Sequence, residues 1–209
     1  MNKHANLTIG IITGVIFLII YNISAFAFQC NEIRANTIRL HVIANSDSAA
    51  DQNIKLKVRD AILSAGPNIF DGTVTPDNAQ KKITNEIQHL ENTANKVLRE
   101  YNQSYNATVS LTTEFFDTRI YDDNLTLPAG KYLALKVVLG EGEGKNWWCV
   151  MFPSLCLPAT EKTNNNALKN TYSDAEKNII ENSDKYEIRF KIIEIIETLK
   201  NKVDIQNIG

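Results

Sequence analysis

The pattern of apolar and polar positions begins with a long uncharged stretch. No side chain between Ala5 and Asn31 carries a charge, and the run from Leu7 to Ile20 is almost entirely apolar. Lys3 precedes this run, and Ser24-Ala25-Phe26-Ala27 follows it. A cationic head, an apolar middle and a small-x-small ending are typical of a secretory signal. We therefore expect a signal peptide over residues 1–27, with Ala25 and Ala27 recognised by signal peptidase and cleavage after Ala27.

An uncleaved membrane anchor is the alternative. Extended to Phe28, the apolar stretch is about long enough to cross roughly 30 Å of hydrocarbon at about 1.5 Å per residue. Its strongest apolar run has the length of a signal peptide, which favours cleavage. Both interpretations place the rest of the chain outside the cytoplasm, and both predict membrane contact only through the N-terminal segment.

The exported part opens with one strand and two helices. Residues 37–44 alternate as a strand, with every second residue from Ile38 to Ala44 apolar. A helix follows the polar residues 45–48, and we expect Gly66-Pro67 to end it. Thr75 and Pro76 start the next helix. Its apolar positions form one continuous stripe: Ala79, Ile83, Ile87, Leu90, Ala94, Val97 and Tyr101.

Three more strands and a last helix follow. The strands are predicted over 107–115, 131–139 and 147–152, so that strand, two helices, an antiparallel meander and a C-terminal helix make a two-layer α+β fold. We divide the exported chain into an α+β domain at 28–159, a polar linker at 160–184 that can hold a short helix, and a C-terminal amphipathic helix at 185–209. The apolar stripe of that helix is formed by Ile188, Ile192, Ile195, Ile196, Leu199 and Val203.

Composition and charge exclude some classes of function. The 209 residues are 44% apolar, which is enough for one domain with a hydrophobic core. The net charge of −2, with no long run of one sign, argues against a nucleic-acid binder, because such proteins need a basic face to neutralise phosphates.

Three cysteines lie in the exported part: Cys30, Cys149 and Cys156. Export permits disulfides, and the turn-like Phe152-Pro153-Ser154 separates Cys149 from Cys156. We predict a disulfide between these two, which would stabilise the fold by roughly 2–3 kcal/mol. The alternative is that both thiols are buried apolar groups.

Catalytic and metal-binding patterns are sparse. The exported part has two histidines, His41 and His89, and neither a His-Glu-x-x-His nor a paired Cys-x-x-Cys motif. We therefore predict no metal site and no cofactor. His41 with Ser46 or Asp47 would suit an extracytoplasmic hydrolase, but there is no Gly-x-Ser-x-Gly elbow. The polar residues around Ser46 are better explained as caps for the following helix.

The segment from Lys145 to Pro153 is the most distinctive in the chain. Alternation places Trp147, Cys149 and Met151 on one face, and the other face receives Trp148, Val150 and Phe152. One face covers the core, and an exposed tryptophan on the other would mark a surface for a partner protein. For Trp147, core packing and partner contact are equally compatible with the pattern.

Several segments together resemble the stage II sporulation protein R family. The opening motif is residues 38–48 with Asp51-Gln52 and Lys57-Val58-Arg59-Asp60. Residues 127–132 and 138–150 carry further pieces, and the resemblance runs from about Thr37 to Leu157 and ends with Arg189-Phe190-Lys191. Two departures affect the turn after the tryptophans: Ser154 stands where a second proline is expected, and 157–159 lacks the usual acid.

The resemblance implies a non-catalytic signalling protein of endospore-forming bacteria. It would be made in the forespore and exported into the intermembrane space. There it would activate a membrane-embedded aspartyl protease of the mother cell, which processes the precursor of sigma-E. The candidate receptor contacts are Asn45, Ser46, Asp47, Trp147 and Trp148. The extracytoplasmic hydrolase and a membrane-anchored structural protein remain the alternatives.

Overall fold

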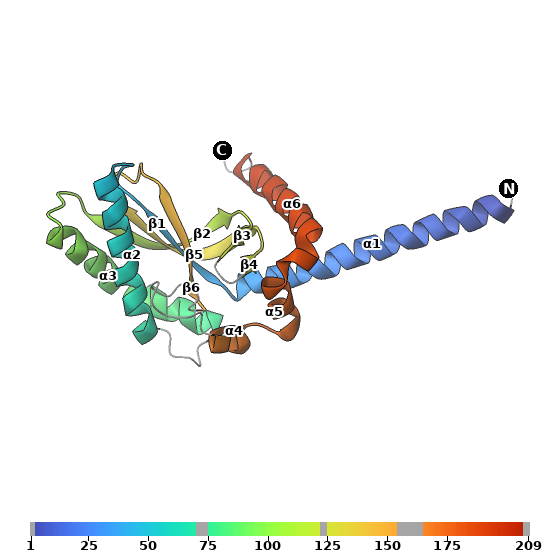
Figure 1. Cartoon of the computed structure of the whole chain (residues 1–209), viewed down its shortest axis with the longest axis horizontal. Helices are drawn as coiled ribbons and strands as arrows, with labels where there is room; N and C mark the ends of the chain where they lie inside the picture. Colours follow the sequence, from blue (N-terminus) through green and yellow to red (C-terminus); the bar gives the residue numbers. More distant parts are fainter. Residues whose placement is uncertain (1–2, 70–74, 122–124, 154–164, 207–209) are drawn as a thin grey trace.

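A single long helix connects the N-terminus to the folded domain. The computed structural model describes residues 3–69, 75–121, 125–153 and 165–206. Helix α1 (Lys3–Ala35) runs unbroken through the predicted cleavage site, and Figure 1 shows its first half protruding from the domain. Its large apolar side chains from Leu7 to Tyr21 are exposed, whereas Phe26, Cys30 and Ile33 are buried. The exposed apolar segment and the first buried residues of the domain therefore belong to the same helix.

The centre of the domain is a mixed sheet of four strands in the order β2-β5-β1-β6. The strands are β1 (Ile38–Ile43), β2 (Ala107–Phe116), β5 (Gly130–Leu139) and β6 (Asn146–Phe152). The predicted α+β class is confirmed, but the strands do not form the simple antiparallel meander. Strand β1 lies between β5 and β6, parallel to β5 and antiparallel to β6. The alternation of a strand specifies its two faces and not its neighbours, which is why the sequence missed this insertion.

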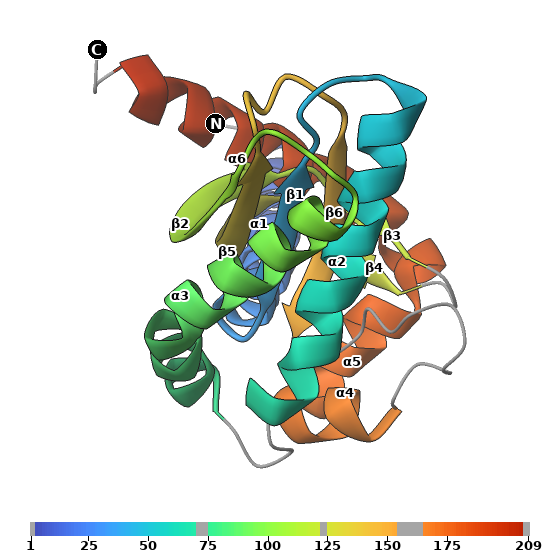
Figure 2. The same cartoon turned by 90° about the vertical axis from the view of Figure 1, so that its left-hand side faces the viewer.

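Two helices cover one face of the sheet, as Figure 2 shows. They are α2 (Ala49–Ile69), which continues past the predicted stop at Gly66-Pro67, and α3 (Pro76–Glu100). Thr75 caps α3 as predicted, because its side chain accepts a hydrogen bond from the Asn78 backbone N–H. The first core, between these helices and the sheet, includes Leu40, Val42, Val58, Ile62, Ile83, Leu90, Leu135 and Val137.

A second core lies on the other side of the sheet. It is built from the end of α1, the short strand β4 (Thr126–Leu127), which pairs with the exposed β3 (Arg119–Ile120), and the C-terminal helices. These helices are α4 (Asn165–Thr171), α5 (Asp174–Glu181) and α6 (Glu187–Gln206), with the 3-10 turn η2 (Ser183–Tyr186) before α6. Its buried residues are Phe26, Cys30, Ile33, Leu125, Leu127, Val150, Leu168, Tyr172, Ile179, Ile180, Phe190 and Ile193.

The stretch interpreted as a polar linker, 160–184, therefore contributes to the packed domain. Four apolar side chains from its described part, Leu168, Tyr172, Ile179 and Ile180, enter the second core. Ser173 starts α5 with a capping box, in which Ser173 and Glu176 exchange side-chain and backbone hydrogen bonds. The polar composition of this stretch suggested a linker, because its helices are short and each buries only a few apolar residues.

Candidate partner-binding surface

The sheet face opposite α2 and α3, which we call the outer face, carries the polar side chains of β1. Arg39 and His41 leave β1 on this face, because successive side chains of a strand alternate. Arg39 is fully buried, and its guanidinium carbon lies 4.2 Å from the ring centroid of Phe116 and 4.9 Å from that of Tyr132. A desolvated cation gains about 2 kcal/mol from such aromatic contacts. Aromatic rings thus hold the cation in place of a carboxylate.

Hydrogen bonds complete the environment of Arg39. Its Nε donates to the carbonyl oxygen of Cys149 at 3.1 Å, and its Nη2 donates to the Tyr121 hydroxyl. Its Nη1 has no hydrogen-bond partner within the described residues. The half of the outer face next to Tyr132 is therefore closed by a buried cation that no ligand can reach directly.

The accessible half of the outer face is centred on His41 and Trp148, whose rings stack with centroids 3.6 Å apart. His41 Nδ1 lies 2.6 Å from Glu114 Oε2, and Lys136 Nζ lies 2.7 Å from Glu114 Oε1. Burial acts to raise the pKa of Glu114, but hydrogen bonds from Lys136 and His41 outweigh it and hold that pKa below its usual value. Glu114 is therefore ionised at neutral pH and orients the His41 ring beneath Trp148.

Residues of mixed character surround the half-buried Trp148. The Phe116 ring packs edge-on at a centroid distance of 4.8 Å, and the exposed Arg119 lies 5.8 Å from the Trp148 ring centroid. Ile120, next along β3, is 71% exposed. Tryptophan and arginine are the residues that most often dominate the binding energy of protein interfaces. We call Trp148, Arg119, Ile120, Glu114 and Lys136 the outer-face patch.

Trp147 has a different role from Trp148. It lies on the opposite face of β6, packs against the first core, and stacks 4.3 Å beneath the guanidinium of Arg59. Alternation predicted this separation of the two tryptophans correctly. It failed for Phe152, which joins the first core, because the pairing of β1 with β6 shifts register between Ile38 and Arg39.

The polar residues after β1 hold that strand against the turn between β5 and β6. Asn45 Oδ1 accepts from a backbone N–H of the turn at 3.1 Å, and Asp47 Oδ1 accepts from the Lys145 backbone N–H at 2.8 Å. Gly144 approaches so closely that a Cβ there would lie 2.3 Å from the Ser46 carbonyl oxygen. These contacts give the loop a structural role, and its contact with a receptor stays a prediction.

Asp51, on α2, ties this loop to the helix. Its Oδ2 accepts from Ser46 Oγ at 2.5 Å and from Asn45 Nδ2 at 3.0 Å, and its Oδ1 accepts from the Tyr105 hydroxyl at 2.6 Å. Burial alone would raise the pKa of Asp51, but these hydrogen bonds, with one to Ser48, outweigh burial and lower it. The polar residues before α2 cap this helix as expected, since the Asp51 backbone N–H donates to Ser48 Oγ at 3.1 Å.

The hydrolase site suggested by the sequence is not assembled. The second nitrogen of His41, Nε2, lies 2.9 Å from Asn146 Oδ1, and the Ser46 hydroxyl is bound to Asp51. His41 does have the carboxylate partner that orients an imidazole in catalytic dyads, but its other nitrogen faces an amide and not a nucleophile. Within the described part of the chain, no group of three or more His, Cys, Asp or Glu side chains is placed to hold a metal ion.

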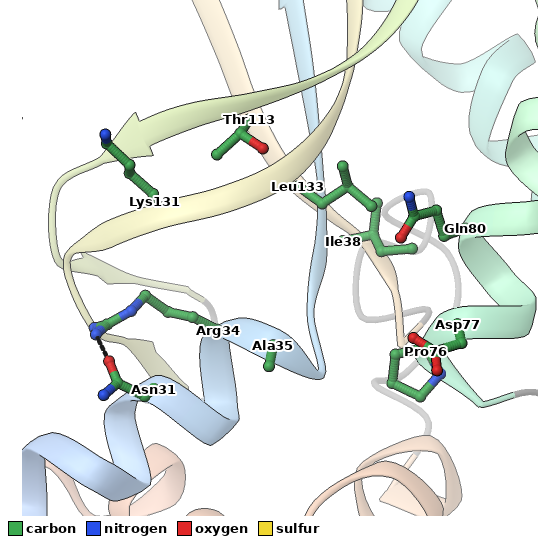
Figure 3. A pocket seen from close by; sticks show the side chains of 10 residues that line it. All are labelled: Asn31, Arg34, Ala35, Ile38, Pro76, Asp77, Gln80, Thr113, Lys131 and Leu133. Carbon is green, nitrogen blue, oxygen red and sulfur yellow. Dashed lines mark hydrogen bonds between the residues drawn. The ribbon is translucent and has the colours of Figure 1, made fainter.

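A pocket of about 520 Å³ lies where the end of α1 meets the start of α3 and the sheet edge, as Figure 3 shows. Its two cations are already engaged. Arg34 donates to the Ala129 carbonyl oxygen at 2.7 Å and to the Asn31 side chain, and Lys131 forms an ion pair with Asp204 at 2.6 Å. Both described cations that line the pocket therefore already have partners, and we assign the pocket no ligand.

The predicted signal-peptidase residues lie within helical α1. Ala25 is exposed, Ala27 is partly buried, and Phe26 between them is 3% exposed in the second core. Among the described helices, α1 contains the one stretch, Asn6–Ala35, that is long and apolar enough to cross a membrane. Cleavage after Ala27 stays a prediction, and it would remove Phe26 from the folded domain.

The cysteines are in two different states. Cys149 is disulfide-bonded, whereas Cys30 is a free and fully buried thiol. Cys156, the predicted partner of Cys149, lies outside the described residues, so this pairing stays a prediction.

Sequence reasoning missed four members of the outer-face patch: Glu114, Lys136, Arg119 and Ile120. Alternation does place Glu114 and Lys136 away from the first core, and this was the available signal. Their meeting with His41 depends on the strand order, which brings β2, β5 and β1 side by side. Arg119 comes from a strand of two residues, which is too short for a periodic signal.

Comparisons with known proteins agree with the sequence motifs. The family model for stage II sporulation protein R (spore_II_R) matches residues 34–164, a range that contains all four strands of the central sheet. Stage II sporulation protein R of Bacillus subtilis (strain 168) is 29% identical over 181 residues, which cover 78% of this chain and 80% of that protein. No solved structure matches this chain. Because the family model covers more than half of its residues, the chain belongs to the stage II sporulation protein R family.

Proposed function

We propose that this sporulation protein is an exported, non-catalytic signal that activates a membrane-embedded aspartyl protease of the mother cell. The protease then processes the precursor of sigma-E. Family membership supports the sporulation role, and the apolar α1, which fits a signal peptide or a membrane anchor, supports export into the intermembrane space.

The outer-face patch is the observation on which the binding role rests. A half-buried tryptophan beside an exposed arginine, with an exposed isoleucine next along the same strand, is costly to leave in water and well suited to a protein partner. The patch lies on strands, so its side chains are held in place before binding, which lowers the entropic cost of association.

Activation by binding requires a difference in affinity between two states of the protease. A signal that binds both states equally shifts nothing. Moving a partner from about 1% to about 99% active requires roughly 5.5 kcal/mol of differential binding. Interface residues of about 2 kcal/mol each supply this amount if about three of them contact only the active arrangement. A patch of five residues is large enough for that purpose.

Reconstituted processing of the sigma-factor precursor tests the proposal. The protease, its precursor substrate and the full-length protein are combined in membranes, and precursor cleavage is followed with and without the protein. We expect cleavage only when the protein is present. Cleavage that is indifferent to the added protein would remove the signalling role.

Two surface variants locate the binding site. Trp148→Ala is expected to weaken activation about 30-fold, which corresponds to about 2 kcal/mol. Because Trp148 also stacks on His41, the exposed Arg119→Glu repeats the test without loss of that packing. Tyr101→Ala is the matched control, because Tyr101 is an aromatic residue that is 44% exposed at the end of α3, outside the patch. Equal activation by the Arg119 and Tyr101 variants would exclude the patch.

The hydrolase alternative is tested by His41→Gln. Glutamine keeps a polar contact with Glu114 but cannot act as a general base. A signalling ligand need not lose its activity with this substitution, whereas an enzyme that depends on His41 does lose it. Loss of activity in a variant of unchanged stability would favour the hydrolase.

A further inference from the structure

Helix α6 carries more apolar surface than the domain covers. Its buried side chains are Phe190 and Ile193, and both lie in the second core. On the opposite side, Ile188 is 77% exposed, Ile195 55%, Leu199 58% and Val203 54%. These four positions are spaced by seven, four and four residues, so they form one continuous stripe along the helix. A helix that is apolar on opposite sides is normally buried on both of them.

The start of α6 packs against α1 at Phe26. Phe26 of α1 stacks on Tyr186 at a centroid distance of 5.5 Å and contacts the Phe190 ring edge-on at 5.3 Å. The exposed apolar part of α1 ends in the same region. From Leu7 to Phe26 there are 20 residues, which span about 30 Å as a helix and match the hydrocarbon thickness of a bilayer. With α1 across a membrane, Ile188 therefore lies at the membrane surface.

The direction of α6 extends this contact. Figures 1 and 2 show α6 starting beside α1, where α1 leaves the domain, and running across it, with its C-terminal end turned back toward the domain, where Asp204 pairs with Lys131 at 2.6 Å. The exposed stripe points away from the core, because it lies opposite Phe190 and Ile193. A helix that crosses a spanning helix at the membrane surface lies along the plane of the bilayer, which is the position of an interfacial amphipathic helix.

We propose that α1 is retained as an anchor and that α6 lies in the surface of the same membrane, with Ile188, Ile195, Leu199 and Val203 in contact with lipid. The domain is thereby attached by two helices and held in one orientation, with its second core next to the bilayer. Lys3 remains on the cytoplasmic side of the producing cell, in agreement with the positive-inside preference. This proposal revises the expectation that only the N-terminal segment touches the membrane, and it does not depend on the signalling role.

Depth-dependent fluorescence in vesicles tests the proposal. The full-length protein is reconstituted in phosphatidylcholine–phosphatidylglycerol vesicles, and Leu199→Cys is labelled with an environment-sensitive dye. Lys200→Cys is the matched control, because Lys200 is the next residue, its side chain is 62% exposed, and it lies on another side of the helix. The fully buried Cys30 is shielded from the dye, and the parent chain gives the labelling background.

The proposal predicts a blue-shifted emission at position 199 and severalfold stronger quenching by lipids that carry a spin label near the headgroup. The dye at position 200 should emit as it does in water. Ile195→Cys repeats the test if the Leu199 variant folds poorly. Water-like emission at both 195 and 199 would overturn the proposal. Disulfide cross-links between the introduced thiols of two Leu199→Cys chains, without lipid quenching, would overturn it in favour of a second copy of the chain.

Retention of α1 is measured separately. The intact mass of the protein recovered from sporulating cells should correspond to the full chain from Met1. A mature protein that begins at Phe28 would show that the anchor is removed and would overturn the proposal, without affecting the test of precursor processing.

Discussion

Removal of the Phe26 side chain tests whether α1 is part of the folded domain. Phe26 is 3% exposed and contacts Tyr186 and Phe190 through its ring. Truncation of a buried phenylalanine to alanine costs about 3–5 kcal/mol, of which each aromatic pair accounts for about 0.5–1.5 kcal/mol. Phe26→Ala should therefore loosen the second core by about 3 kcal/mol or more. Phe28→Ala is the control, because Phe28 lies on the same helix but is 58% exposed.

The free thiol of Cys30 provides the assay. Cys30 lies one turn after Phe26, is fully buried, and reacts with a labelling reagent only when the second core opens. Since each 1.4 kcal/mol changes an equilibrium about tenfold, Phe26→Ala should accelerate labelling about 100-fold or more. Phe28→Ala should leave the rate within about twofold of the parent chain, because exposed positions change stability by less than about 0.5 kcal/mol. Mass spectrometry of the labelled peptide identifies the thiol that has reacted.

A chain that begins at Phe28 extends the same test. It represents the product of the predicted cleavage, it lacks Phe26, and it should label Cys30 at least as fast as Phe26→Ala does. Equal labelling rates for the Phe26 and Phe28 variants would refute the reasoning. In that case the second half of α1 would not be packed on the domain, and α6 would lose its fixed position relative to the membrane.

Three further substitutions test the sheet and its loop. Arg39→Lys should destabilise the protein by about 3–5 kcal/mol in urea unfolding, because lysine keeps a buried charge but loses the planar contacts of the guanidinium. Arg39→Met should destabilise the protein less, because it removes the buried charge. The opposite order of the two variants would contradict this account of Arg39. Hydrogen bonds outweigh burial and lower the pKa of Asp51, so its carboxylate contributes stability above an unfolded pKa of about 3.9 and loses that contribution as the pH falls through the lower folded value. Asp51→Asn should therefore be destabilising at pH 7 and should become less destabilising as the pH is lowered below about 3.9. Gly144→Ala should cost about 1–3 kcal/mol in thermal unfolding, because the new Cβ collides with the Ser46 backbone, and an unchanged melting temperature would show that the turn moves freely.

The sequence predicted the local elements well because their periodicity is strong. The stripe of α3 is confirmed from Ala79 to Val97, and Tyr101, its last predicted member, is exposed at the end of the helix. The alternation of β1 correctly separated the core residues from Arg39 and His41. The neighbours of β1 were not predictable, because a period of two residues gives the faces of a strand and carries no information about pairing.

The candidate surface was half predictable for the same reason. Trp148 could be identified from its residue type and its position opposite Trp147. The contact between His41 and Glu114 joins residues that are 73 positions apart, and it forms because β5 lies between their strands and provides Lys136 as a common neighbour. A sequence motif cannot contain such a site, since His41, Glu114 and Lys136 lie on three different strands that are far apart along the chain.

Helix α6 shows where periodicity fails in a different way. Of the six residues in the predicted stripe, Ile188, Ile195, Leu199 and Val203 are exposed, whereas Ile192 and Ile196 are partly buried. A periodic pattern does not say which of two apolar faces meets the domain. Two side chains outside that stripe, Phe190 and Ile193, are the ones that enter the second core, because the 3-10 turn before α6 and the ring contacts of Phe26 determine the rotation of the helix. The stripe is thereby directed outward, and the free energy of its exposure must be offset by something other than the domain. In the arrangement that we propose, the bilayer that α1 is apolar enough to cross covers this stripe, and the rotation of α6 then links the fold to the membrane.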